Sequence, residues 1–110
     1  MAKFIKGDIV VIDFPFSDLS ATKKRPALVL ATVSNQDLIL CQITSKANKD
    51  NDAISLMTID FKVGQLPVDS FIRPNKLFTA DSNIISRKIG GINQKTLDAT
   101  VSKIIDIITR

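Results

Sequence analysis

Histidine, tryptophan, tyrosine and glutamate are all missing from this chain of 110 residues, and cysteine occurs once. Without histidine, neither a histidine acid–base pair nor a histidine metal site is possible. A single cysteine excludes an intramolecular disulfide and a cysteine metal cluster. The eleven acidic residues are all Asp and are scattered along the chain, whereas metal sites need clustered ligands. There is also no glycine-rich phosphate loop, so we expect no metal and no cofactor.

Long apolar runs are missing as well. No segment approaches the roughly 20 apolar residues of a membrane span, and no signal peptide opens the chain, so we expect a cytoplasmic protein with no membrane partner. The length predicts a single domain over residues 1–110. Cys41 lies inside an apolar run, which predicts a buried thiol rather than a nucleophile.

Positive charge is present in moderate excess, with a formal net charge of +4. Such a balance is compatible with a polyanionic partner but does not demonstrate one. Lys23, Lys24 and Arg25 stand together directly before Pro26. A proline fixes its own φ and lacks an N–H, so it suits the first residue of a strand, and it pushes the preceding residue into an extended conformation. We therefore expect Arg25 to be held at the mouth of a sheet, although a solvated charge cluster is the commoner explanation in an arbitrary protein.

Short β-branched and apolar runs separated by turn residues predict a mainly β (α+β) fold. Strands come first and one helix last, which indicates a small, strongly curved antiparallel sheet or barrel closed by a helix. Residues 15–22, 46–52 and 61–69 are predicted loops. The predicted strands are residues 8–14, 27–33, 38–43, 53–59 and 70–79 with a kink at Pro74, and residues 83–89 form a strand or a helical turn that ends at Gly90 and Gly91.

The C-terminal segment predicts an amphipathic helix of about four turns. Asn93 is a good N-cap, and Ile92 and Leu97 have the spacing of a hydrophobic staple. The aliphatic stripe predicts that the helix covers the sheet as a lid. It consists of Leu97, Val101, Ile104, Ile105 and Ile108.

Residues 27–33 and 38–43 are predicted to pair as an antiparallel hairpin, because residues 34–37 are typical turn residues. A turn centred between residues 35 and 36 places Arg25 opposite Lys46, and Ala27 opposite Thr44. A shift in register would change these pairs but would keep Arg25 and residues 44–46 at the same end. Both strands are apolar at nearly every position, as in strands covered on both faces. We expect the helix to cover one face and a second subunit to cover the other.

The remaining polar residues suit phosphate chemistry. Arginine, lysine, serine and threonine can bind a phosphate and stabilise charge on it, and RNA carries its own nucleophile in the 2′-OH. This set of residues permits a metal-independent ribonuclease without requiring one.

Five stretches, spread over almost the whole chain, carry a family resemblance: GDIVVIDFPFS (7–17), KRPALVL (24–30), ITS (43–45), SFIRPNKL (70–77) and KIGGI (88–92). In this order they resemble the PemK/MazF-type toxins. The resemblance implies a homodimer of small SH3-like antiparallel barrels of the CcdB/MazF type, each with a C-terminal helix. It also implies a sequence-specific, metal-independent endoribonuclease that cuts single-stranded RNA to a 2′,3′-cyclic phosphate and a 5′-OH. A cognate antitoxin would inhibit it, and DNA would be reached only through that antitoxin.

The resemblance also implies roles for individual residues. Arg25 matches the family's catalytic arginine and Thr44 its catalytic threonine. Some members use an arginine and an aspartate two residues apart. Here Arg73 matches the arginine but Asn75 replaces the aspartate, and the histidine that some members carry in the first loop is also missing. The candidate substrate-binding residues are Ser17, Lys24, Ser45, Lys46, Arg73 and Asn75.

Two other functions stay open at this point. The related CcdB-type fold poisons DNA gyrase without cutting RNA, so the chain could be a toxin that binds a protein. It could also be a non-catalytic RNA-binding barrel in which Lys23, Lys24, Arg25 and Lys46 only contact phosphates, although its aromatic residues are all Phe and offer few stacking platforms.

Overall fold

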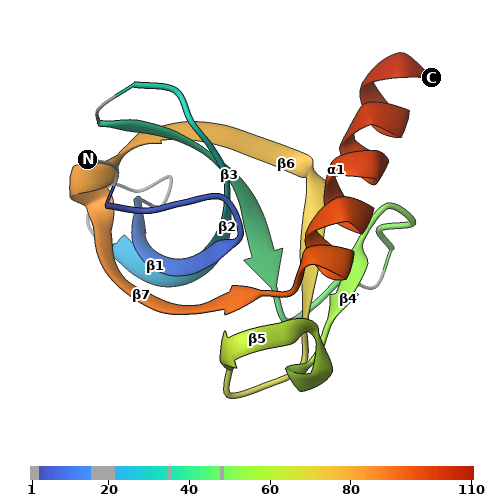
Figure 1. The fold of residues 1–110 in the computed structure, drawn as a ribbon, viewed down its shortest axis with the longest axis horizontal. Helices are drawn as coiled ribbons and strands as arrows, with labels where there is room; N and C mark the ends of the chain where they lie inside the picture. Colours follow the sequence, from blue (N-terminus) through green and yellow to red (C-terminus); the bar gives the residue numbers. More distant parts are fainter. Residues whose placement is uncertain (1–2, 16–21, 35, 48) are drawn as a thin grey trace.

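The computed structural model describes residues 3–15, 22–34, 36–47 and 49–110, and its strands form one strongly curved sheet (Figure 1). Within these residues the strand order is β4-β6-β3-β2-β1-β7-β5, and every pair is antiparallel. The predicted mainly β fold with a C-terminal helix is confirmed. The elements are β1 (Asp8–Pro15), β2 (Thr22–Thr32), β3 (Asp37–Thr44), β4 (Ile54–Leu56), η1 (Thr58–Asp60), β5 (Phe61–Gly64), β6 (Ser70–Asp81), η2 (Ser82–Ile84), β7 (Ile85–Ile92) and α1 (Gln94–Thr109).

The hairpin of β2 and β3 forms as predicted, but its register differs by two residues. Ala27 pairs with Gln42 and not with Thr44. A β-bulge between Val29 and Ala31 shifts the register, and no sequence pattern indicates such a bulge. If the observed register is continued two residues beyond Ala27, Arg25 lies level with Thr44. The predicted register had placed Ala27 opposite Thr44. The predicted meeting of Arg25 and Thr44 at one end of the hairpin is therefore retained.

Pro26 lies inside β2 and not at its first residue. Strand β2 begins at Thr22, and pairing with β3 begins only at Ala27. Among the described residues, the strand therefore pairs only with β1 over residues 22–26, with Pro26 opposite Val11. A strand tolerates a missing N–H where it forms an edge. Pro26 therefore does not end β2, which extends back through the cationic residues.

Besides β2 and shifts of one or two residues at the ends of β1, β3 and β6, three elements differ from the prediction. The fourth strand is limited to β4, because Asp60 accepts a hydrogen bond from the Met57 amide (2.8 Å) and closes the turn η1. The predicted loop 61–69 contains β5, which pairs with β7. Strand β7 continues through Gly90 and Gly91 instead of ending there. A Cβ on Gly90 would lie 2.6 Å from the Val63 carbonyl oxygen, so the glycine permits the close approach of β5.

Strand β6 has the predicted irregularity at Pro74. Leu77 pairs with Cys41 and Arg73 pairs with the next residue, Gln42, so three residues of β6 bulge out between these pairs. Pro74 is fully buried in this bulge. Its missing N–H costs no ladder hydrogen bond where the pairing is already interrupted.

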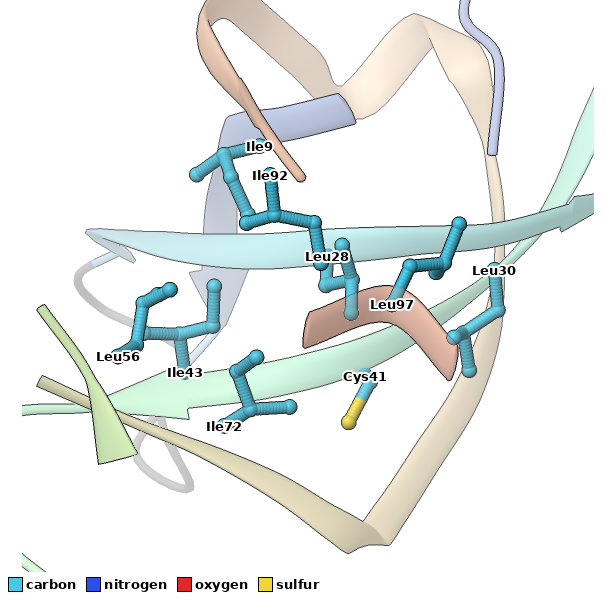
Figure 2. Close-up of a cluster of buried hydrophobic side chains, with 9 residues drawn as sticks. All are labelled: Ile9, Leu28, Leu30, Cys41, Ile43, Leu56, Ile72, Ile92 and Leu97. Atoms are coloured by element: carbon cyan, nitrogen blue, oxygen red, sulfur yellow. The ribbon is translucent and has the colours of Figure 1, made fainter. Parts of the chain in front are cut away.

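Two buried clusters cover opposite faces of the central strands. Leu28 and Leu30 of β2 belong to the first, whereas Ala27 and Val29 belong to the second, as alternation along a strand requires. Figure 2 shows the first cluster, into which Leu97 reaches from α1. The prediction that both faces are covered is confirmed. The cover comes from the chain itself, so the two apolar faces by themselves do not call for a second subunit.

Helix α1 begins as predicted but covers less of the sheet. The Asn93 side chain accepts a hydrogen bond from the Thr96 amide (2.8 Å), and Ile92 and Leu97 are both buried in the first cluster. The prediction that the last part of the helix also covers the sheet is wrong, because Ile105 is 54% exposed and Ile108 is 71% exposed. In Figure 1 the C-terminal turns of α1 extend past the sheet, so these residues have little beneath them.

Candidate functional site

Arg25 and Thr44 line the same hollow, which has a volume of about 370 Å³. Arg25 comes from the edge portion of β2 and Thr44 from the last residue of β3. The hollow combines four cations, three hydroxyl groups and an apolar wall. Its lining residues are Lys23, Lys24, Arg25 and Arg87; Thr44, Ser45 and Ser70; and Val11, Pro26, Ile43, Leu66, Pro67, Val68 and Ile89.

The backbone around Arg25 is fixed by the strand on each side. Arg25 pairs with Ile12 of β1, and Ile12 is fully buried in the second cluster. Pro26 fixes its own φ and also lines the hollow. The guanidinium therefore extends from a rigid strand and not from a loop.

Lys24 is paired with a carboxylate of the neighbouring strand. Its ammonium group forms an exposed salt bridge to Asp13 on β1, with Nζ 3.0 Å from Oδ1. An exposed pair of this kind contributes little to stability, in the range of about 0–1 kcal/mol. Lys24 therefore lines the hollow with its charge partly balanced by Asp13.

Thr44 closes a turn at the exit from β3. Its hydroxyl accepts a hydrogen bond from the Lys46 amide and donates one to the Lys46 carbonyl, both at 3.1 Å. Ser45, between them, is exposed and lines the hollow of Arg25. Lys46 does not line that hollow but a second one, so the structure separates it from the other predicted residues of the hairpin mouth.

Arg73 and Asn75 also lie in the second hollow, of about 270 Å³, which Lys46, Ala47, Lys49 and Asp50 complete. Arg73 Nε lies 2.8 Å from Asp50 Oδ2, and Asn75 Nδ2 donates to Asp50 Oδ1 at 3.1 Å. The hydrogen bond from Arg73 is the main cause that lowers the pKa of Asp50, and Asn75 adds to it. The two residues are thus brought together with a carboxylate, but not into the hollow of Arg25.

Ser17, the remaining predicted substrate-binding residue, lies outside the described residues. Four polar residues of the two hollows were missed by the sequence analysis: Ser70 and Arg87 in the hollow of Arg25, and Lys49 and Asp50 in the second hollow. Arg87 is exposed on β7 opposite Val11 and lines the hollow of Arg25. The polar run 86–88 between Ile85 and Ile89 was an available signal, but residues 83–89 were left as strand or helical turn. Asp50 had no local signal, because Arg73 and Asn75, the side chains that it binds, lie more than 20 residues away.

The single cysteine is buried in the first cluster, as predicted. Its thiol donates a hydrogen bond to the Arg73 carbonyl oxygen (2.8 Å). Burial raises the pKa of Cys41 to about 12, despite the opposing effect of that hydrogen bond. The thiol is therefore protonated at neutral pH and is a poor nucleophile.

Two further properties concern the described part of the chain. It contains no group of three or more His, Cys, Asp or Glu side chains with the geometry to hold a metal ion. None of its helices is both long and apolar enough to span a membrane. The hollow of Arg25 instead offers cations and hydroxyl groups, a combination that binds phosphate and stabilises negative charge on it.

A comparison with protein families matches residues 5–108 to the family described as "PemK-like, MazF-like toxin of type II toxin-antitoxin system". This match spans every strand from β1 to β7 and all but the last residue of α1. No curated protein matched the chain by sequence.

Solved structures share the fold at low identity. A MazE–MazF crystal structure (Form-III) from Deinococcus radiodurans has a TM-score of 0.77 and 17% identity, and the alignment covers 96% of this chain and 95% of that one. An endoribonuclease in complex with its cognate antitoxin, from a mycobacterial species, has a TM-score of 0.74 and 11% identity over 98% and 95% of the two chains. The Mycobacterium tuberculosis toxin MazF-mt6 has a TM-score of 0.72 and 16% identity over 92% and 95%.

Proposed function

The chain belongs to the PemK-like, MazF-like toxin family of type II toxin–antitoxin systems, and on this premise we propose that it is an endoribonuclease that cuts single-stranded RNA in a sequence-specific, metal-independent reaction. The observation that carries the proposal is the hollow that Arg25 and Thr44 share with three further cations. Solved structures with this fold include a mycobacterial endoribonuclease. A basic hollow beside hydroxyl groups suits a phosphodiester, and its apolar wall suits a base.

In the proposed reaction, the 2′-oxygen of the substrate attacks the adjacent phosphorus atom. The bond from phosphorus to the 5′-oxygen then breaks, which gives a 2′,3′-cyclic phosphate and a 5′-OH. The 2′-OH loses its proton to a base, and the leaving 5′-oxygen gains one, so the reaction consumes no net proton. Arg25 stabilises the extra negative charge of the phosphorane, as a planar guanidinium does well.

Thr44 contacts the scissile phosphate in this proposal. A hydroxyl group has one donor hydrogen and two acceptor lone pairs. The donor is directed to the Lys46 carbonyl in the free protein. On binding RNA it rotates to a phosphate oxygen, while the oxygen atom continues to accept from the Lys46 amide.

The decisive experiment measures cleavage of single-stranded RNA by the purified protein in excess EDTA. Arg25→Ala should lower the cleavage rate about 10²–10³-fold, as the loss of one charge-stabilising donor does elsewhere. Lys95→Gln, an exposed cation on α1, is the matched control and should cleave normally. An RNA with one 2′-deoxy nucleotide on the 5′ side of the cut should resist cleavage.

Several results would contradict the proposal. Full activity of Arg25→Ala would show that the site is wrong, and loss of activity in EDTA would show that the reaction needs a metal. Growth arrest that persists in Arg25→Ala while cellular RNA stays intact would instead indicate a toxin that binds a protein. Mapping the 5′ ends of cleaved transcripts would show whether the cuts follow one sequence.

We also infer a cytoplasmic homodimer that a cognate antitoxin neutralises by covering the RNA surface, and DNA contact only through that antitoxin. A structure with this fold is an endoribonuclease bound to its antitoxin. Ile105 and Ile108 on the exposed end of α1 are candidates for the dimer interface, because exposed clusters of large aliphatic residues mark contact surfaces. Light scattering should give a dimer for the wild type and a monomer for Ile105→Lys/Ile108→Lys. A wild-type monomer at micromolar concentration would contradict the inference.

A further inference from the structure

The second hollow is joined to the candidate active site by the sheet itself. Thr44 pairs with Phe71 of β6, and Gln42 pairs with Arg73. Paired residues and alternate residues along a strand project from the same face. Arg73 therefore lies on the same face of the sheet as Thr44. It is two residues along β6 from Phe71, the residue opposite Thr44, which is about 7 Å at the usual rise of a strand.

Asp50 holds Arg73 by one edge only. The carboxylate side chain is 7% exposed and accepts from Nε of Arg73, whose own side chain is 25% exposed. Within the described ranges, the two terminal nitrogens of that guanidinium make no hydrogen bond. These nitrogens form the pair of donors that binds a phosphate in bidentate fashion. Lys46 and Lys49 line the same hollow, so three cations surround one carboxylate.

Asp50 is itself held in place by its neighbours. The Asp52 amide donates to Asp50 Oδ1 (3.0 Å), and Asn75 donates to the same oxygen from β6. Arg110, after the end of α1, holds the Asp52 carboxylate through both terminal nitrogens at 3.2 and 3.1 Å. A carboxylate fixed by its neighbours can fix the orientation of the arginine that it holds.

From this arrangement we infer that the Lys46–Lys49–Arg73 hollow is a second phosphate subsite, which binds a backbone phosphate of the substrate next to the scissile one, and that Asp50 is the positioning residue that presents Arg73 to it. The inference rests on the proposed ribonuclease function. It assigns the hollow a phosphodiester ligand and gives Asp50 an indirect role, because its own negative charge would repel the RNA.

The sign of the Asp50 effect separates positioning from simple electrostatics. If Asp50 only added negative charge, Asp50→Asn would bind RNA more tightly. If it positions Arg73, Asp50→Asn binds several-fold more weakly, and the effect disappears in an Arg73→Gln background because there is no arginine left to position.

The experiment measures binding of a 2′-deoxy-substituted, uncleavable RNA by the intact protein over a range of salt concentrations. Arg73→Gln should lower affinity about 3–10-fold and reduce the slope of log K against log salt by about 0.7, the loss of one phosphate contact on a single strand. Arg73→Lys, which keeps the charge but lacks Nε and the planar fork, should keep the slope and lose affinity. Lys95→Gln should match the wild type, and thermal unfolding checks that each variant is folded.

Several outcomes would overturn the inference. Arg73→Gln with wild-type affinity and slope would exclude the subsite, and tighter binding by Asp50→Asn would exclude positioning. Arg73→Lys provides the test if Asp50→Asn does not fold, since wild-type affinity in that variant would show that orientation is unimportant. If the wild type cleaves RNA and depends on Arg25 while Arg73→Gln binds normally, only the second subsite fails. If the wild type neither binds nor cleaves RNA, the proposed function fails with it.

Discussion

The Thr44 hydroxyl holds the backbone of Lys46 from both sides, accepting from its amide and donating to its carbonyl at 3.1 Å. This short turn ends β3 at the mouth of the Arg25 hollow. It also sets the direction in which the chain leaves toward the second hollow. One side chain thus belongs to the candidate chemistry and to the local fold.

The first prediction separates these two roles. Thr44→Ser keeps the hydroxyl and should retain most of the cleavage rate. Thr44→Val keeps the shape but loses the hydroxyl, so it should lose about 10²-fold or more in rate while its free energy of unfolding falls by only about 0.5–1.5 kcal/mol. RNA cleavage and denaturant unfolding measure the two effects. A fully active Thr44→Val would remove Thr44 from the reaction.

The second prediction concerns Arg87, which faces the hollow from β7. Arg87→Gln should weaken binding of uncleavable RNA about 3–10-fold and flatten its salt dependence by about one phosphate contact, or about 0.7 in slope. Lys62→Gln removes an exposed cation from β5 that does not line the hollow, and serves as the control. Equal affinities of the two variants would mean that Arg87 does not contact RNA.

The third prediction uses the ionisation of Asp50. Its pKa lies below the ordinary value of 3.8, mainly because Arg73 donates a hydrogen bond to the charged form. The folded state then holds its proton more weakly than the unfolded state. This contribution to stability is present above about pH 4 and is lost as the pH falls through the folded pKa. The difference in unfolding free energy between the wild type and Asp50→Asn should therefore be constant from pH 7 to 5 and shrink below pH 4. A difference that persists unchanged at pH 2 would contradict the ion pair.

The fourth prediction concerns Cys41. Burial raises the pKa of its thiol from 9.0 to about 12. Between these values the unfolded thiol loses its proton while the folded thiol keeps it. Stability conferred by this group is complete below pH 9 and falls above it, by at most about 1.4 kcal/mol per pH unit. Cys41→Ala should show a shallower alkaline decline in its unfolding free energy. At pH 8 a thiol reagent should modify the wild type only on unfolding, and rapid modification of the native protein would contradict the burial.

The fifth prediction tests the close approach of β5 and β7. A Cβ at Gly90 would meet the Val63 carbonyl oxygen at 2.6 Å, whereas one at Gly91 would meet its nearest neighbours at 3.6 Å. Gly90→Ala should lower the free energy of unfolding by about 1–3 kcal/mol, as overpacking does. Gly91→Ala is the matched control and should be milder. Chemical denaturation of both proteins measures the difference, and equal stabilities would argue against the tight pairing.

The β2–β3 hairpin shows how far the sequence alone specifies the candidate site. Two apolar runs around turn residues were enough to pair the strands and to bring Arg25 and Thr44 to one end. The register was wrong by two residues. The pairing next to the turn, Thr32 with Leu38, already differs by one residue from the prediction, and the bulge near Leu30, which no residue pattern indicates, adds the second. The predicted meeting of Arg25 and Thr44 survived this error, since adjacent strand ends stay adjacent when a register shifts.

Contacts between distant segments account for what the sequence did not reveal. The pairing of Asp50 with Arg73 depends on how a loop folds over β6, and neither residue has a neighbour in the chain that indicates the other. Likewise, the aliphatic stripe of α1 predicted a buried face correctly near Leu97. It could not indicate where the sheet beneath ends, so the exposure of Ile108 was not foreseen.

The two buried clusters have a consequence for how this protein tolerates change. The strands that carry Arg25 and Thr44 are packed on both faces, and substitutions inside them create cavities or overpacking. Residues around the rim, such as Lys49 and Val68, are exposed and line the two hollows. Exchanges at the rim cost little folding energy. In the proposed ribonuclease they would change what an RNA base or phosphate encounters, so the sequence preference could change while the strands that carry Arg25 and Thr44 stay the same.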